Sequence, residues 1–184
     1  MAERHAADAA RFGALIAEAG ADDWARPSPD AGWTAFDVAN HVVEWLPGFL
    51  ASRSGIELTP VDLRDDALAA WTLRTDEVQR VIEERGDEPF VSPAFGESTL
   101  AQMLGQLYVG EVWMHGWDLA QALGLPFDLG AERSAEALAS MQPMDDLLRQ
   151  GGQFGPKVPV PDDASPQDRF LGFIGRDPAW QPPA

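Results

Sequence analysis

The chain has 184 residues, and 45% of them are hydrophobic, which is typical of a globular protein with an ample core. Its formal net charge of −17 excludes the basic patches that nucleic acids and anionic membranes need in a partner. It has no cysteine, which excludes disulfides, thiolate metal sites and cysteine nucleophiles. Any bound metal must therefore have nitrogen and oxygen ligands.

No run of 18 apolar residues is present, and the first ten residues alternate charge with alanine and lack the apolar stretch of a signal peptide. We therefore expect a soluble, cytoplasmic protein. Its expected partner is a small-molecule substrate, without nucleic acid or membrane, and a homodimer is left open.

In chain order, residues 3–19 predict a helix with Ala9, Phe12 and Ile16 on one face, ended by Gly20. A loop rich in Pro, Asp and Gly follows to residue 33. Thr34, with an acid three residues on, then resembles a capping box and opens a second helix, in which Pro47 is expected to bend or tighten the last turns.

A third helix is predicted from about residue 65 to 85, with a core face of Leu68, Trp71, Thr75, Val78 and Ile82. Residues 89–95 have extended character. Ser98 is expected to cap a long fourth helix, which Gly124 closes.

A fifth helix is predicted over about 130–150, with Pro143 inside it. The remaining residues, about 151–184, are predicted to form a mostly irregular strap over the bundle, with one short helix near 167–174. Strand signals are sparse and do not pair convincingly. The sequence therefore predicts a single all-α domain over residues 1–184, a helical bundle with an extra C-terminal helix and strap.

Three ionisable residues, Glu111, His115 and Asp118, interrupt the apolar stripe of the fourth helix. Glu111 and His115 are four residues apart and project side by side, and the same stripe carries Leu100, Leu104, Leu107 and Ala122. Burying such groups costs several kcal/mol unless they are paired or bind a metal. His41 is the only other histidine placed inside an amphipathic helix, so His41, Glu111 and His115 could form a three-ligand metal site.

Each of these residues also has a plainer interpretation. His41 could be a hydrogen-bonded core histidine, and Glu111 and His115 could simply pair with each other. Asp118 could orient the His115 imidazole, or it could be an acid that faces solvent. His5 is expected on the solvated surface.

Several residues near the histidines are also candidates for the site. Glu44 could be a general base but is expected to face elsewhere. Most of the tryptophans around the histidines, Trp33, Trp113 and Trp117 among them, are expected to be core residues. Trp45 is the best candidate for a substrate pocket because it follows His41 by four residues.

A family resemblance rests on the runs GWT at 32–34, NHV at 40–42 and EVWMHGWDLA at 111–120. They resemble the DinB-like up-down four-helix bundle, in the branch of the mycothiol-dependent maleylpyruvate isomerase N-terminal domain. The runs GPKVPVPDDASPQDRFL at 155–171 and GRDP at 175–178 resemble a single-domain, metal-binding subgroup of that branch.

The resemblance implies a divalent metal bound by His41, Glu111 and His115, and mycothiol as a thiol cofactor. Imidazole and carboxylate ligands suit zinc or nickel. The isomerase carries an additional C-terminal domain that contributes to its active site, so its particular reaction is not carried over to this chain. Two function classes stay open. One is a metal-dependent enzyme that activates a low-molecular-weight thiol for transfer to, or isomerisation of, a small electrophile; the alternative is a non-catalytic metal- or ligand-binding bundle.

Overall fold

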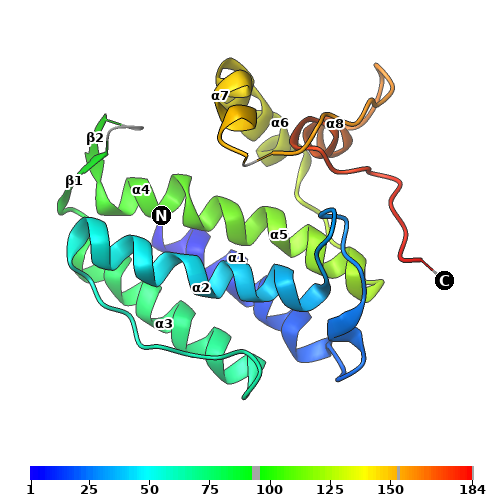
Figure 1. The fold of residues 1–184 in the computed structure, drawn as a ribbon. Helices are drawn as coiled ribbons and strands as arrows, with labels where there is room; N and C mark the ends of the chain where they lie inside the picture. Colours follow the sequence, from blue (N-terminus) through cyan, green and yellow to red (C-terminus); the bar gives the residue numbers. More distant parts are fainter. Residues whose placement is uncertain (93–95, 153, 184) are drawn as a thin grey trace.

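The fold is described here from a computed structural model, which covers residues 1–92, 96–152 and 154–183. It is mostly helical, as predicted, with one small two-stranded sheet (Figure 1). In chain order the elements are α1 (Ala2–Glu18), the 3-10 turn η1 (Asp23–Ala25), α2 (Ala35–Ser54), α3 (Ala67–Arg85), β1 (Pro89–Ser92), β2 (Gly96–Thr99), α4 (Leu100–Gln106), α5 (Tyr108–Leu123), α6 (Ala131–Met141), the 3-10 turn η2 (Gln142–Met144), α7 (Asp145–Gln150) and α8 (Pro166–Ile174).

The long helices lie side by side and enclose the main core. Helix α1 packs against both α3 and α5, and α2 packs against α5 (Figure 1). Phe12 of α1, Leu46 of α2 and Leu119 of α5 are completely buried in this core. Burial of this apolar surface, at about 25 cal/mol per Å², is the main force that holds α2 and α5 in contact.

The predicted start of the second helix and the predicted C-terminal end of the fourth helix are confirmed. The Thr34 hydroxyl accepts from the backbone N–H of Asp37, whose carboxylate accepts from the backbone N–H of Thr34. The last turn of α5 ends at Gly124, which has a left-handed backbone (φ 72°) that favours glycine. Helix α2 continues through Pro47 to Ser54.

The start of the fourth helix was predicted incorrectly. Strands β1 and β2 form an antiparallel hairpin with Phe90 opposite Ser98, a pairing that the sequence pattern did not predict. Ser98 thus belongs to a strand, and Thr99 is the cap, in a capping box with Gln102. The predicted extended segment is confirmed over Pro89–Ser92, and its remainder, 93–95, lies outside the described residues.

Two of the predicted helices are interrupted. The fourth is divided at Leu107 into α4 and α5, although backbone hydrogen bonds still join Leu107 to Met103 and Glu111 to Leu107. The fifth is divided into α6 and α7 by the 3-10 turn around Pro143, a residue that has no N–H to donate to the helix. On α3, Leu68 is 43% exposed, so its predicted place on the core face is wrong, whereas Trp71, Val78 and Ile82 are buried.

The C-terminal part packs on the outer side of α5. Helix α8, close to the predicted 167–174, contacts α6, and together they cover Trp113 and Trp117 of α5 with a second apolar cluster that includes Phe170. The carboxylate of Asp8 on α1 accepts two hydrogen bonds from Arg133 of α6, both at 2.7 Å. Within the described ranges no helix is long and apolar enough to cross a membrane.

Candidate metal centre

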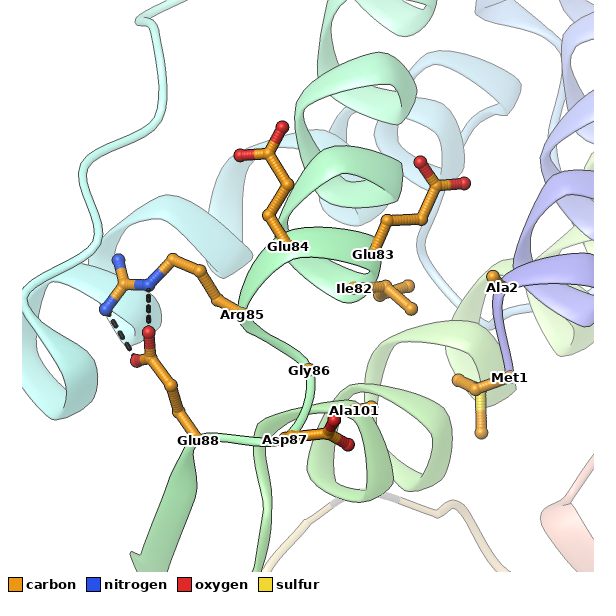
Figure 2. A pocket seen from close by; sticks show the side chains of 10 residues that line it. All are labelled: Met1, Ala2, Ile82, Glu83, Glu84, Arg85, Gly86, Asp87, Glu88 and Ala101. Atoms are coloured by element: carbon orange, nitrogen blue, oxygen red, sulfur yellow. Dashed lines mark hydrogen bonds and ion pairs between the residues drawn. The ribbon is translucent and has the colours of Figure 1, made fainter.

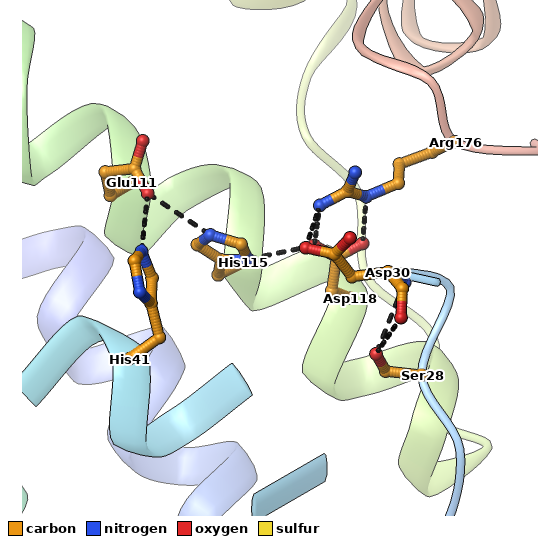
Figure 3. Close-up of polar contacts among 7 residues, drawn as sticks. All are labelled: Ser28, Asp30, His41, Glu111, His115, Asp118 and Arg176. Carbon is orange, nitrogen blue, oxygen red and sulfur yellow. Dashed lines mark hydrogen bonds and ion pairs between the residues drawn. The ribbon is translucent and has the colours of Figure 1, made fainter. Parts of the chain in front are cut away.

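Three predicted site residues meet between α2 and α5. Oε2 of Glu111 lies 3.2 Å from Nε2 of His41 and 3.2 Å from Nε2 of His115 (Figure 3). One ligand atom from each residue lies within 4.8 Å of the others. The sequence therefore predicted this meeting correctly, and metal ligation itself stays a prediction.

Local structure explains the meeting. Thr34 starts α2 seven residues before His41, so the imidazole is two turns into the helix, on the side that faces α5. Glu111 and His115 are one turn apart on α5 and project side by side. The contact between the two helices then brings the third donor to the other two.

The donor set fits a divalent ion. Bonds of about 2.0–2.2 Å to nitrogen and oxygen place the ligand atoms of a tetrahedral ion about 3.3–3.6 Å apart, close to the separations found here. The side chains of His41 and Glu111 are 33% and 29% exposed, whereas that of His115 is 8% exposed. The group is thus accessible on its His41 side and closed behind His115.

Hydrogen bonds favour the charged forms of Glu111 and His115. Burial opposes charge on Glu111, but hydrogen bonds with His115 and His41 outweigh it and lower the pKa of the carboxyl to about 2. Burial likewise opposes charge on His115, but its bonds to Asp118 and Glu111 outweigh that effect and raise its pKa to about 10. An imidazolium at His115 therefore occupies this place at neutral pH.

A second layer of charged residues supports His115 from behind. Asp118 Oδ2 accepts from Nδ1 of His115 at 2.9 Å, and both oxygens of Asp118 accept from Arg176 at 3.0 Å (Figure 3). Arg176 also donates to Asp30 at 2.6 Å. Burial opposes the charge of Asp118, but its bonds to His115 and Arg176 keep its pKa below the usual value.

The loop before α2 supplies Asp30 and an aromatic wall. Its backbone is closed by hydrogen bonds from Ser28 N to Trp33 O and from Trp33 N to Asp30 O. The Trp33 ring is stacked on that of His115, with centroids 5.7 Å apart and planes 17° apart, and lies 5.0 Å from the His41 ring. Trp33 is therefore partly buried against the core, as expected, and its ring also lines the centre.

The other predicted residues have varied outcomes. Glu44 is exposed, as expected. Trp113 and Trp117 are core residues, as expected. Trp45 is partly buried against Phe49 and Tyr108, and a pocket role for it stays a prediction.

The prediction for His5 is wrong. Its ring is 1% exposed, and Nδ1 lies 2.6 Å from Oε1 of Gln79 on α3. The spacing of His5, Ala9, Phe12 and Ile16 places all four on one helical face, and this signal could have revealed its burial. The charged, alanine-rich composition around His5 obscured it.

Arg176 and Asp30 were not identified from the sequence. They are 146 residues apart, and both lie in segments without a helical or strand period. For Arg176 the sequence offered one weak signal: it is an arginine directly after Gly175, the C-cap of α8, in a strongly acidic chain.

A cavity of about 500 Å³ lies away from this centre, at the end of α3 beside Met1 (Figure 2). Its polar lining is mainly acidic, from Glu83, Glu84, Asp87 and Glu88, and Glu88 pairs with Arg85. None of the residues that line it belongs to the candidate centre, so it does not extend that site.

Comparisons with known proteins identify the family of this chain. The model of the family described as "Mycothiol maleylpyruvate isomerase N-terminal domain" matches residues 5–120, which include His41, Glu111 and His115. No solved structure matches the chain.

Two relatives are named as uncharacterized proteins of Mycobacterium tuberculosis strain H37Rv. Rv0738 is 30% identical over 191 residues, which cover 96% of this chain and 96% of that protein. Rv0036c is 31% identical over 136 residues, which cover 61% of this chain and 52% of that protein. With a family match over more than half of its length, this chain belongs to the mycothiol maleylpyruvate isomerase N-terminal domain family.

Proposed function

We propose that this protein binds a divalent metal ion through His41, Glu111 and His115 and uses it to activate a low-molecular-weight thiol toward a small electrophile. The observation that carries the proposal is the position of Glu111 Oε2, 3.2 Å from both imidazole Nε2 atoms. We further propose that the long helices form the up-down four-helix bundle of the DinB type, and that residues 1–184 are one domain.

Charge supports a divalent ion. Glu111, Asp118 and Asp30 carry three negative charges, and Arg176 carries one positive charge, so two negative charges remain when both histidines are neutral. A divalent ion would balance them. Zinc and nickel both suit imidazole and carboxylate ligands.

Each residue around the candidate metal centre has a proposed role. His41, Glu111 and His115 hold the ion. Asp118 holds the His115 ring by its Nδ1–H, so that Nε2 faces the ion, and Arg176 keeps Asp118 in place. Trp33 limits the access of water to the histidine rings.

The thiol must come from outside the protein, because the chain has no cysteine. The family description names mycothiol, which we propose as the thiol cofactor. When bound, a divalent ion with three protein ligands lowers the pKa of a thiol or water at its open position. We also propose that the partner is a small-molecule substrate, without nucleic acid or membrane. A homodimer and a cytoplasmic location are proposals as well.

The test is a thiol titration of the cobalt-substituted protein. We expect a sulfur-to-metal charge-transfer band that is absent in His115→Ala, and consumption of a reactive electrophile that requires both metal and thiol. A band without turnover would favour the alternative, a binding protein that holds metal and ligand. Full metal loading with neither band nor turnover would contradict thiol activation.

A further inference from the structure

His5 has a defined tautomer. Gln79 donates its amide N–H to Glu83 at 2.6 Å, so its amide oxygen faces His5 and accepts from Nδ1 at 2.6 Å. Nδ1 therefore carries the proton, and Nε2 carries a lone pair. Burial lowers the pKa of His5, which agrees with a neutral ring.

His5 Nε2 is buried inside the protein. Among the described residues, His5 Nε2, the Tyr108 hydroxyl and Arg74 Nε have no hydrogen-bond partner. All three side chains are fully buried and come from three different helices, α1, α5 and α3. The rings of His5 and Tyr108 are 6.0 Å apart. Burial raises the pKa of the Tyr108 hydroxyl, and the positive charge of Arg74 opposes that rise.

These three groups complement one another. Tyr108 stays protonated, so it and Arg74 Nε offer two donors, whereas His5 Nε2 offers an acceptor. Buried polar atoms nearly always have a partner, because one without a partner loses its hydration and gains nothing in return. A water molecule can accept from both donors and donate to the acceptor, and about three bonds are usual for a buried water.

We propose that at least one ordered water molecule bridges His5 Nε2, the Tyr108 hydroxyl and Arg74 Nε inside the helical core. The water extends the line from Glu83 through Gln79 and His5 to Tyr108. Tyr108 precedes Glu111 by one helical turn, so this hydrated line runs from the surface to the layer next to the candidate metal centre. The proposal does not depend on metal binding.

The first test is Tyr108→Phe, which removes only the hydroxyl. If water bridges it, the variant breaks the network and lowers the Tm by at least ~2–4 °C. If the hydroxyl has no partner, its removal relieves an unpaired buried group, and an unchanged or raised Tm would overturn the proposal. Thr72→Val is the control, because the exposed Thr72 hydroxyl on α3 already donates to the backbone carbonyl of Leu68, so its loss should leave the Tm nearly unchanged.

The second test is a high-resolution crystal structure of the unmodified protein. We expect water density within hydrogen-bond distance of His5 Nε2 and of the Tyr108 hydroxyl. A direct bond between those two atoms, or an empty space between them, would refute the bridge even if Tyr108→Phe failed to fold. Metal content should be the same in Tyr108→Phe and the unmodified protein, which separates this result from the metal proposal.

Discussion

Asp118 and His115 are three residues apart on α5, and the carboxylate of Asp118 holds the Nδ1–H of His115 at 2.9 Å. This bond directs the opposite nitrogen, Nε2, toward Glu111. A ring oriented in this way by a buried carboxylate is typical of histidines that bind metals. The pair therefore links the C-terminal Arg176 to the three candidate ligands.

The metal ligands can be tested by substitution. His41→Ala, Glu111→Ala and His115→Ala should each strongly lower the metal content, because each removes one of three donors. Elemental analysis of protein purified without an affinity tag measures this. Glu44→Ala, which changes an exposed acid one turn from His41, should keep full metal content. Equal metal content in all four variants would disprove the assignment.

The role of Asp118 in positioning His115 predicts an effect on metal affinity. Asp118→Asn keeps the size of the side chain but removes the charge that favours Nδ1–H donation, so the affinity should fall about 10–100-fold. Competition with a chelator measures the affinity. An unchanged value would show that the His115 ring is held without this carboxylate.

Arg176 should matter for stability. Arg176→Met leaves the buried Asp118 without its guanidinium and should lower the free energy of unfolding of the metal-free protein by about 3–5 kcal/mol. Denaturant titration measures this change. Arg169→Met is the control: Arg169 is exposed and donates to a backbone carbonyl, so its loss should change stability by less than about 1 kcal/mol. Similar losses in both variants would contradict the role of Arg176.

Stability and metal binding should depend on pH in opposite ways at high pH. The pKa of His115 is raised from 6.5 to about 10, so its contribution to the stability of the metal-free protein is complete below about pH 6.5 and is lost as the pH rises through 10. Glu111, whose pKa is lowered from 4.5 to about 2, contributes above about pH 4.5, and its contribution is lost as the pH falls through 2.

Because only a neutral imidazole binds a metal, metal affinity should rise with pH across the neutral range. Calorimetry at pH 7.5 in two buffers of different ionisation enthalpy should show about one proton released per ion, from His115. Binding without proton release would show that His115 is not the displaced acid.

Local information in the sequence was sufficient for much of the fold. The helical period, the capping box at Thr34 and the stop at Gly124 act over a few residues, so they could be recognised without knowing the tertiary structure. The pairing of Glu111 and His115 follows from their spacing on one helix. The hairpin of β1 and β2 was missed because its strands are only four residues long and give little periodic signal.

The residues themselves determined that this chain is helical, acidic and without cysteine, and that it carries Glu111 and His115 on one face. Only the tertiary structure decided that His5 is buried and that Arg176 pairs with Asp118 and Asp30. The physical reason is that buried ion pairs and hydrogen bonds join residues 58 to 146 positions apart, and no local periodicity specifies which distant charge will neutralise a buried one.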